Sequence, residues 1–508
     1  MTKDLFPKVP KCLLLLCAML IVSLWVHAVK IKNRGDRLYV YRYILTSKGA
    51  TPSIERPQRF LSHKSIERRR RQGLKVDSTD LPISPAYINI FETNNTHVLG
   101  TSRWQQTVLV SSNDSLILEQ LARLPMVKDR CCVYISPDSI EQEEDIRWLV
   151  REQFNRWDSV KNDPYGMARP QIESLQGVRL HEAGYRGKGI TIAVIDAGFR
   201  GVDRIPAFQQ THVVGTHDFA SWLNEKGGKP RYNEKTGKKR KGDNADKFLE
   251  GPTFYATDHG TKVFSALAAQ APEVIIGTAP EASYWLLRSE ILMTEQPIEE
   301  DLWTMAAEFA DSVGVDIINS SLGYSAYDKG RGNYSHEDLD GQTAFISRSA
   351  SMLANKGIVL CNSAGNSGTS IWKKISVPAD APNIITVGAI DAEGQPVSFS
   401  SAGPTADGRV KPDVVARGSN TALLSGTGRL IHDMGTSFST PIISGLTACL
   451  WQALPQLTAH EIIDLVRSSA HQYETPDSLK GYGAPDFWKA YNKALPSSSQ
   501  GGDAQIEE

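Results

Sequence analysis

Three segments of the sequence carry a carboxylate, an imidazole and a hydroxyl where an α/β enzyme places its reactive groups. Asp196 directly follows an apolar, β-branched run, and His259 opens an apolar helical pattern. Ser437 lies in Gly-Thr-Ser-Phe-Ser-Thr-Pro, at the start of a second helical pattern. Ligands of open α/β sheets bind at the carboxyl ends of strands, close to helix starts. Each segment alone also fits an ordinary turn, a structural histidine or a helix cap.

A fourth segment completes a set of groups that can work together. Asn366 lies in Ser-Ala-Gly-Asn-Ser-Gly, just after another predicted strand. A serine hydroxyl is unreactive at neutral pH until a base takes its proton, and an imidazole with a pKa of about 6.5 suits that task. A carboxylate fixes the tautomer of the imidazole, and an amide donor stabilises an oxyanion. Together the four residues predict a mechanism with a nucleophilic serine.

The order of these residues and the sequences around them resemble the subtilisin-like serine peptidases, or subtilases. The signatures are His-Gly-Thr-x-Val and Gly-Thr-Ser-x-Ser-x-Pro, and the resemblance extends from Gly187 to Trp488. It implies that Asp196 is the carboxylate, His259 the general base and acid, Ser437 the nucleophile and Asn366 the oxyanion donor. The backbone N–H of the nucleophile, at its helix start, would be the second donor.

The resemblance also implies where a substrate binds. Ser321, Leu322 and Gly323 would pair with the backbone of an extended polypeptide, as a peptide joins the edge of a sheet. Ala364 and Gly365 would form the opposite wall of the pocket for the residue before the cut. The implied activity is that of a serine endopeptidase, which hydrolyses peptide bonds through an acyl-enzyme.

Two features depart from the usual subtilase pattern. Ala197 follows the catalytic aspartate where most subtilases have Ser or Thr, so one hydroxyl donor to the carboxylate is missing. The stretch Glu225–Lys247 is dense in Lys, Gly and Asn, and we interpret it as an inserted surface loop. The alternative function is a catalytically silent relative that keeps the fold and binds an extended peptide. The intact set of four residues weighs against this alternative.

Strand-like and helix-like segments alternate along most of the chain, which predicts an α/β fold with a doubly wound, mostly parallel sheet over residues 170–492. Helical patterns over Asp301–Ser312 and Thr343–Asn355 separate some of the predicted strands. Those strands are Ile190–Ile195, Val274–Ile276, Tyr284–Leu287, Asp316–Asn319, Gly357–Cys361 and Ile384–Val387.

Residues 29–150 form a second predicted unit, a small α/β domain. The resemblance implies that this unit is a prodomain that assists folding and inhibits the enzyme from within the same chain. A permanent accessory domain is the alternative. Residues 151–169 are interpreted as a linker that contains the processing site, and residues 493–508 as a polar tail.

The first 28 residues have the pattern of a secretory signal. Lysines precede the apolar run Cys12–Ala28, which ends in Val26-His27-Ala28, so we expect cleavage after Ala28. The alternative is an uncleaved anchor, because the run is close to the roughly 17 residues that span a bilayer. Membrane attachment is expected only in that case. The expected location is secreted, periplasmic or in the cell envelope.

Composition limits the partners and cofactors. The 508 residues include 56 Lys and Arg against 57 Asp and Glu, a formal net charge of -1, which removes the main electrostatic argument for a nucleic-acid partner. The predicted chemistry needs no cofactor. Many subtilases bind calcium, but no acidic loop of calcium-binding spacing is present, so no metal site is assigned. We expect a monomer.

The cysteines and a run of arginines are two further patterns whose interpretation depends on contacts that the sequence does not show. Cys361 and Cys449 lie in apolar contexts and are interpreted as buried thiols, while Cys131 and Cys132 are adjacent, and spacing leaves any disulfide among the four open. Arg68–Arg71 is a run of four arginines within a helical pattern. It is interpreted as a solvated helix face, with a processing site or an anion-binding patch as alternatives.

Overall fold

The computed structural model describes residues 29–32, 37–137, 139–142, 159–223, 252–254, 256–292 and 294–495. The predicted signal with its cut after Ala28, the Lys-rich stretch 225–247, residues 151–158 of the predicted linker and residues 496–508 of the predicted tail lie outside these ranges. In the described residues, no helix is both long and apolar enough to cross a membrane.

A parallel sheet of seven strands forms the centre of the larger unit, in the order β15-β14-β13-β12-β7-β11-β8. All neighbouring strands in this sheet run parallel. The strands are β7 (Thr191–Asp196), β8 (His212–Asp218), β11 (Ser283–Arg288), β12 (Ile317–Ser320), β13 (Val359–Ser363), β14 (Ile385–Ile390) and β15 (Val414–Arg417). The predicted doubly wound α/β fold is therefore confirmed.

Alternate residues of strand β7 show why both faces of this sheet are covered. Ile192 and Val194 belong to one buried apolar cluster, whereas Ala193 and Ile195 belong to another on the opposite face. Helices α5 (Arg169–Glu173), α6 (Gly177–Glu182), α7 (His259–Ala268), α10 (Thr436–Ala453), α11 (Ala459–Ser469) and α12 (Phe487–Ala494) contribute to the first cluster. Helices α8 (Ile298–Val313) and α9 (Phe345–Met352) contribute to the second cluster.

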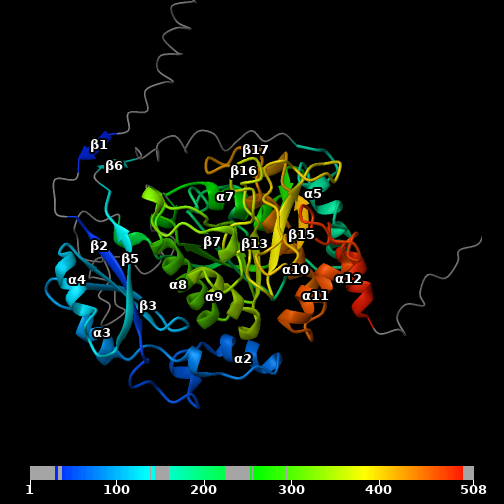
Figure 1. Cartoon of the computed structure of the whole chain (residues 1–508). Helices are drawn as coiled ribbons and strands as arrows, with labels where there is room; N and C mark the ends of the chain where they lie inside the picture. Colours follow the sequence, from blue (N-terminus) through cyan, green and yellow to red (C-terminus); the bar gives the residue numbers. More distant parts are fainter. Residues whose placement is uncertain are drawn as a thin grey trace, which may run out of the picture.

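The amino-terminal unit is a smaller α/β domain that lies beside helices α8 and α9 (Figure 1). Its antiparallel sheet has the order β3-β4-β2-β5 and packs on two helices around a core of its own. The strands are β2 (Tyr39–Leu45), β3 (His97–Ser102), β4 (Thr107–Ser112) and β5 (Val127–Ile135), and the helices α3 (Pro85–Phe91) and α4 (Ser115–Leu121). A separate helix, α2 (His63–Arg71), lies between strands β2 and β3 in the sequence.

The remaining described strands form three short antiparallel pairs. They are β1 (Val29–Lys32) with β6 (Ser139–Gln142), β9 (Gln270–Ala271) with β10 (Ile275–Ile276), and β16 (Thr421–Leu424) with β17 (Leu430–Asp433). The prediction of a main-sheet strand over Val274–Ile276 is wrong, because this segment folds back onto Gln270–Ala271. The strand is too short and too tightly turned to reach the parallel sheet.

The arginine run also differs from its interpretation as a solvated helix face. Arg68 and Arg69 on α2 are only 2% and 1% exposed, whereas the side chain of Arg70 is 74% exposed. Arg68 and Arg69 both pair with Asp311 of helix α8, a carboxylate that offsets the cost of burying them. Local sequence placed these residues on a helix correctly, but only the long-range partner decides which face is buried.

The cysteines follow their predicted environments. Cys361 and Cys449 are buried, and both are free thiols, as are Cys131 and Cys132. The question of disulfides among these four residues is thereby settled, because the structure pairs none of them.

Candidate active site

The carboxylate of Asp196 lies at the carboxyl end of strand β7 and is fully buried. Its Oδ1 accepts hydrogen bonds from the ring Nδ1 of His259, at 2.7 Å, and from the backbone N–H of Ala197, also at 2.7 Å. The neighbouring strand places Ser289 at its end, where the Ser289 N–H donates to the Asp196 carbonyl oxygen. A central strand of the sheet therefore fixes the position of this carboxylate.

His259 occupies the first position of helix α7 and presents its ring to that carboxylate. The helix start lies close to the turn after β7, because a Cβ at Gly260 would come within 2.5 Å of the Gly198 carbonyl oxygen. Burial lowers the pKa of His259, but the charge of Asp196 outweighs this effect and raises that pKa above its usual range. The imidazole is thus held in one orientation with its basicity increased.

The second oxygen of Asp196, Oδ2, is buried and has no hydrogen-bond partner in the part of the chain that the structure describes. Ala197, which follows it, has no hydroxyl to offer. The departure noted in the sequence therefore has a visible consequence, since no other described side chain compensates for the missing donor. A carboxylate oxygen without a donor is less stable as an anion.

Ser437 lies in the first turn of helix α10 and is almost completely buried. Its Oγ donates to the Ser321 carbonyl oxygen at 3.4 Å, and its own carbonyl accepts from the Ser321 hydroxyl at 2.9 Å. No hydrogen bond joins Ser437 to His259 among the described residues. The ring centres of His259 and Phe438, the residue after Ser437, lie 6.0 Å apart, so the structure brings the three predicted residues close together. The serine hydroxyl is bonded to the Ser321 carbonyl rather than to the imidazole.

Asn366 follows strand β13, and its side chain is oriented by the residue before Ser437. The N–H and the hydroxyl of Thr436 both donate to Asn366 Oδ1, each at 3.0 Å. The amide Nδ2 consequently points the other way, towards Gly435, whose Cβ position lies 3.7 Å from it. Gly435 has φ 154° and ψ 148°, a conformation that favours glycine. Thr436 is a positioning residue that the motif contained but that sequence reasoning did not single out.

The predicted substrate strand follows strand β12, and its residues change from buried at Ser321 to exposed at Gly323. The Leu322 carbonyl accepts from the Asn362 side-chain amide at 3.2 Å, which turns it inwards. Gly323 is exposed, and in the described part of the chain its N–H and carbonyl have no hydrogen-bond partner. An extended peptide that docks here would find unpaired backbone groups.

Ala364 and Gly365, the predicted opposite wall, lie across from this strand with Ser376 between the two walls. A Cβ on Gly323 would come within 3.0 Å of the Ser376 Cβ, and a Cβ on Gly365 within 2.8 Å of the Ser376 Oγ. Gly365 has φ 106°, so a larger residue there would be strained as well as crowded. Ser376 has no motif of its own, and only the fold places it between Gly323 and Gly365.

The described residues contain no group of three or more His, Cys, Asp or Glu side chains arranged to hold a metal ion.

The sequence matches the models of two protein families. Residues 187–483, more than half of the chain, match the model of the Subtilase family, Peptidase S8. This chain belongs to the subtilase family. Residues 41–147 of this subtilase match the Peptidase S8 propeptide domain of Bacteroidota. The resemblance is therefore confirmed, and at the level of the family the protein is a serine peptidase made as a proenzyme.

Individual relatives are distant. This subtilase is 28% identical over 326 residues to the serine protease AprX of Bacillus subtilis (strain 168), a match that covers 59% of this chain and 65% of AprX. It is 26% identical over 356 residues to subtilisin E of the same organism, which covers 70% of this chain and 74% of subtilisin E. The crystal structure of MycP1 from the ESX-1 type VII secretion system gives a TM-score of 0.47 at 22% identity, over 67% of this chain and 92% of that one.

Proposed function

We propose that this subtilase is a secreted or cell-envelope serine endopeptidase that hydrolyses peptide bonds through an acyl-enzyme on Ser437. The observation that carries the proposal is the 2.7 Å hydrogen bond from His259 Nδ1 to the buried Asp196, close to the helix start that carries Ser437 and contacts Asn366. A buried Asp–His pair beside a serine at a helix start is the arrangement that serine nucleophiles require.

The proposed reaction begins when a peptide docks along Ser321, Leu322 and Gly323. The Ser437 Oγ turns away from the Ser321 carbonyl and attacks the peptide carbonyl carbon, while its proton passes to His259 Nε2. Asp196 stabilises the imidazolium that forms. The carbonyl oxygen gains the negative charge, which the amide Nδ2 of Asn366 and the backbone N–H of Ser437 stabilise.

Collapse of this intermediate breaks the C–N bond, and His259 gives its proton to the departing amine. A water molecule then attacks the acyl-enzyme carbonyl carbon and transfers a proton to His259. The ester bond to Ser437 breaks, and the imidazole returns its proton to the serine oxygen. The proposed chemistry uses only protein groups and water.

The side chain between the two predicted walls supports a preference in the substrate. Ser376 would lie 3.0 Å from a Cβ on Gly323 and 2.8 Å from a Cβ on Gly365, so a small polar side chain borders the proposed space for the residue before the cut. We infer a preference for small, uncharged residues at that position. Sequencing the products from an unfolded protein tests this, because frequent cuts after large aromatic residues would contradict it.

We also propose that the amino-terminal domain is removed as a prodomain by a cut within the predicted linker 151–169. Tyr165 and Ala168 are buried in the core of the catalytic unit, and the Val160 N–H donates to the Glu273 carbonyl at 2.7 Å. This packing favours a cut before Val160. The amino-terminal sequence of the catalytic chain would show this cut, and that of the amino-terminal fragment would show the expected cut after Ala28.

The experiment compares the wild type with Ser437→Ala and with Ser439→Ala. Ser439 is buried in the same helix turn and takes no part in the proposed reaction, so it serves as a matched control. Wild type and Ser439→Ala should lose the prodomain and hydrolyse an unfolded protein, and Ser437→Ala should do neither. Equal activity in Ser437→Ala would refute the proposal. A wild type that binds peptides without hydrolysing them would instead support the silent relative.

A further inference from the structure

Helix α2 belongs to the amino-terminal domain by sequence but not by packing. The apolar core of that domain comes from the four-stranded sheet and helices α3 and α4, and α2 contributes none of the described members of that cluster. In Figure 1 the helix lies apart from this sheet, below the catalytic unit. We define the α2 segment as Leu61–Asp80, the helix with the residues on either side that make its contacts.

The guanidinium of Arg68 is inserted into the catalytic unit. Its Nη1 donates to the Val315 carbonyl at 2.5 Å and its Nε to the Lys356 carbonyl at 3.1 Å. Its Nη2 pairs with the carboxylate of Asp311 on helix α8. Nη2 also donates to the Asp311 carbonyl at 3.4 Å, so one buried side chain of the α2 segment satisfies three main-chain carbonyls and one charge of the other domain.

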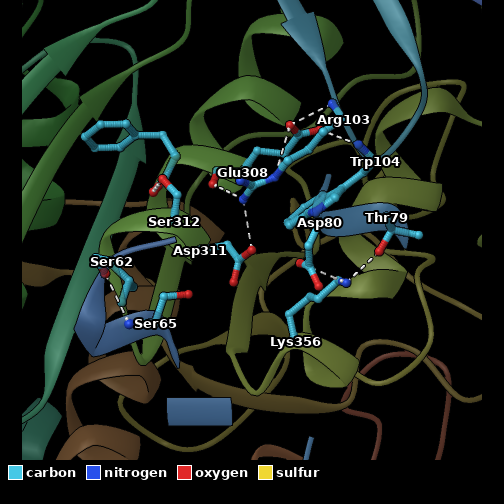
Figure 2. Close-up of polar contacts among 12 residues, drawn as sticks. Ser62, Ser65, Thr79, Asp80, Arg103, Trp104, Glu308, Asp311, Ser312 and Lys356 are labelled. Carbon is cyan, nitrogen blue, oxygen red and sulfur yellow. Dashed lines mark hydrogen bonds and ion pairs between the residues drawn. The ribbon is translucent and has the colours of Figure 1, made fainter. Parts of the chain in front are cut away.

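Asp311 is the centre of this interface, and two more arginines reach it. Its Oδ2 accepts from Arg69 of α2 at 2.9 Å and from Arg103 of the β3–β4 connection at 3.0 Å. Burial raises the pKa of Asp311, but Arg68, Arg69 and Arg103 together hold it at about 2. Figure 2 shows Arg103 between Asp311 and Glu308, which accepts from the Trp104 N–H.

In a second buried ion pair the charges are reversed, because the cation belongs to the catalytic unit and the carboxylate to the α2 segment. Lys356 of the catalytic unit pairs with Asp80 of the α2 segment at 3.1 Å and donates to the Thr79 hydroxyl at 2.5 Å (Figure 2). Beside it, Gln72 donates to the Gly357 carbonyl at 2.9 Å and accepts from the Ala459 N–H at 2.8 Å. Each domain thus provides a buried ion whose partner is in the other domain.

These contacts lie at the opposite ends of the strands that carry the active site. Lys64 pairs with Thr191 at the start of β7, and Asp196 ends the same strand, about 16 Å away along an extended backbone. Val315 precedes β12, which Ser321 follows. In the same way, Lys356 and Gly357 precede β13, which Ala364 follows, so the α2 segment docks on the amino ends of three catalytic strands.

Release of the amino-terminal domain would leave Asp311 and Lys356 without their charged partners. Breaking a buried pair is strongly unfavourable, since the remaining ion is left uncompensated until water reaches it. We propose that the α2 segment is a docking device that keeps the amino-terminal domain bound after the chain is cut, so the processed enzyme is a complex of two chains. This proposal depends on the proposed function only for the cut in the linker.

The test uses the full chain with Ser437→Ala, in which a recognition sequence for a site-specific protease replaces part of residues 143–158. After folding and cleavage by the added protease, size-exclusion chromatography over a dilution series measures how much amino-terminal fragment remains bound. The fragment should co-elute with the catalytic unit. Arg68→Ala and Arg69→Ala should weaken its binding by about 100-fold to 1,000-fold.

Arg70→Ala is the matched control, because Arg70 lies in the same run, is exposed and, among the residues that the structure describes, pairs only with Glu67 of its own helix. It should leave binding unchanged. If an arginine variant does not fold, Gln72→Ala removes two interdomain hydrogen bonds without removing a charge and should weaken binding about tenfold. A fragment that separates from the unsubstituted interface, or variants that behave like Arg70→Ala, would overturn the proposal. Hydrolysis by the wild type is measured separately, so a silent enzyme would not affect this result.

Discussion

The two ends of strands β7, β12 and β13 differ in how their polar groups are satisfied. At the carboxyl ends, Asp196 Oδ2 and the backbone of Gly323 have no hydrogen-bond partner in the described residues. At the amino ends, both oxygens of the Asp311 carboxylate are paired with arginines. Under the proposed function, the polar groups at the carboxyl ends, where a substrate would bind, are left without partners. The groups between the two domains, at the amino ends, are paired in the folded chain.

The largest effect on stability is expected at the amino ends of the strands, where Asp311 is paired with arginines. Asp311→Asn removes the charge that three arginines share, so the free energy of unfolding of the proenzyme should fall by about 3–5 kcal/mol. Urea unfolding of the full chain with Ser437→Ala measures this. Asp464→Asn is the control, because Asp464 is 77% exposed, and it should change stability by less than about 1 kcal/mol. Equal effects of the two substitutions would mean that Asp311 does not hold the domains together.

A large effect on catalysis is expected at the carboxyl ends of the strands. Asn366→Ala removes one of two donors to the oxyanion, and kcat should fall about 10²-fold to 10³-fold. The free energy of unfolding should also fall by about 1–3 kcal/mol, because the buried Thr436 loses the acceptor of two hydrogen bonds. Steady-state kinetics and thermal unfolding measure the two effects separately. An unchanged kcat would mean that the amide of Asn366 does not face the reacting carbonyl.

The pH dependence of activity tests the environment of the base. His259 must be neutral to accept the serine proton, and Asp196 raises the pKa of its imidazole. Activity should therefore fall as the pH is lowered, with the midpoint of kcat/KM above about 6.5. Burial lowers the pKa of His181 to about 4, so that residue stays neutral throughout the range. A midpoint below 6.5 would indicate that Asp196 does not control the imidazole.

The smallest expected effect concerns the unpaired oxygen of Asp196. Ala197→Ser offers a hydroxyl beside Oδ2, and a single added hydrogen bond would raise kcat/KM by at most about tenfold. Ala197→Val, which adds bulk without a donor, is the matched control. If serine and valine have the same effect, packing rather than a missing donor explains the position.

Much of the fold and of the site could be predicted, because the relevant signals are local. Strand β7 is an apolar run that ends in Asp196, and the His259 and Ser437 motifs stand at the starts of helices α7 and α10, as expected. Within the parallel sheet, the strands that were not predicted are β8 and β15. β8 is an edge strand of the sheet with alternating exposed and half-buried residues, so it lacks the continuous apolar pattern of a central strand.

The rest could not be predicted, because it depends on residues that are far apart in the sequence. The arginines of α2 look like a solvated face until Asp311, more than 240 residues away, is brought beside them. Ser376 lies between Gly323 and Gly365 only because the fold brings these three residues together. Sequence periodicity contains no information on such pairings.

The most direct test of the central claim is labelling with a fluorophosphonate, which reacts with a serine only when a neighbouring base activates it. The processed wild type should carry one label, and mass spectrometry should locate it on the peptide that contains Ser437. Ser437→Ala should carry none, while Ser439→Ala should be labelled like the wild type. A processed wild type without a label, or a label retained in Ser437→Ala, would contradict the assignment of Ser437 as the nucleophile.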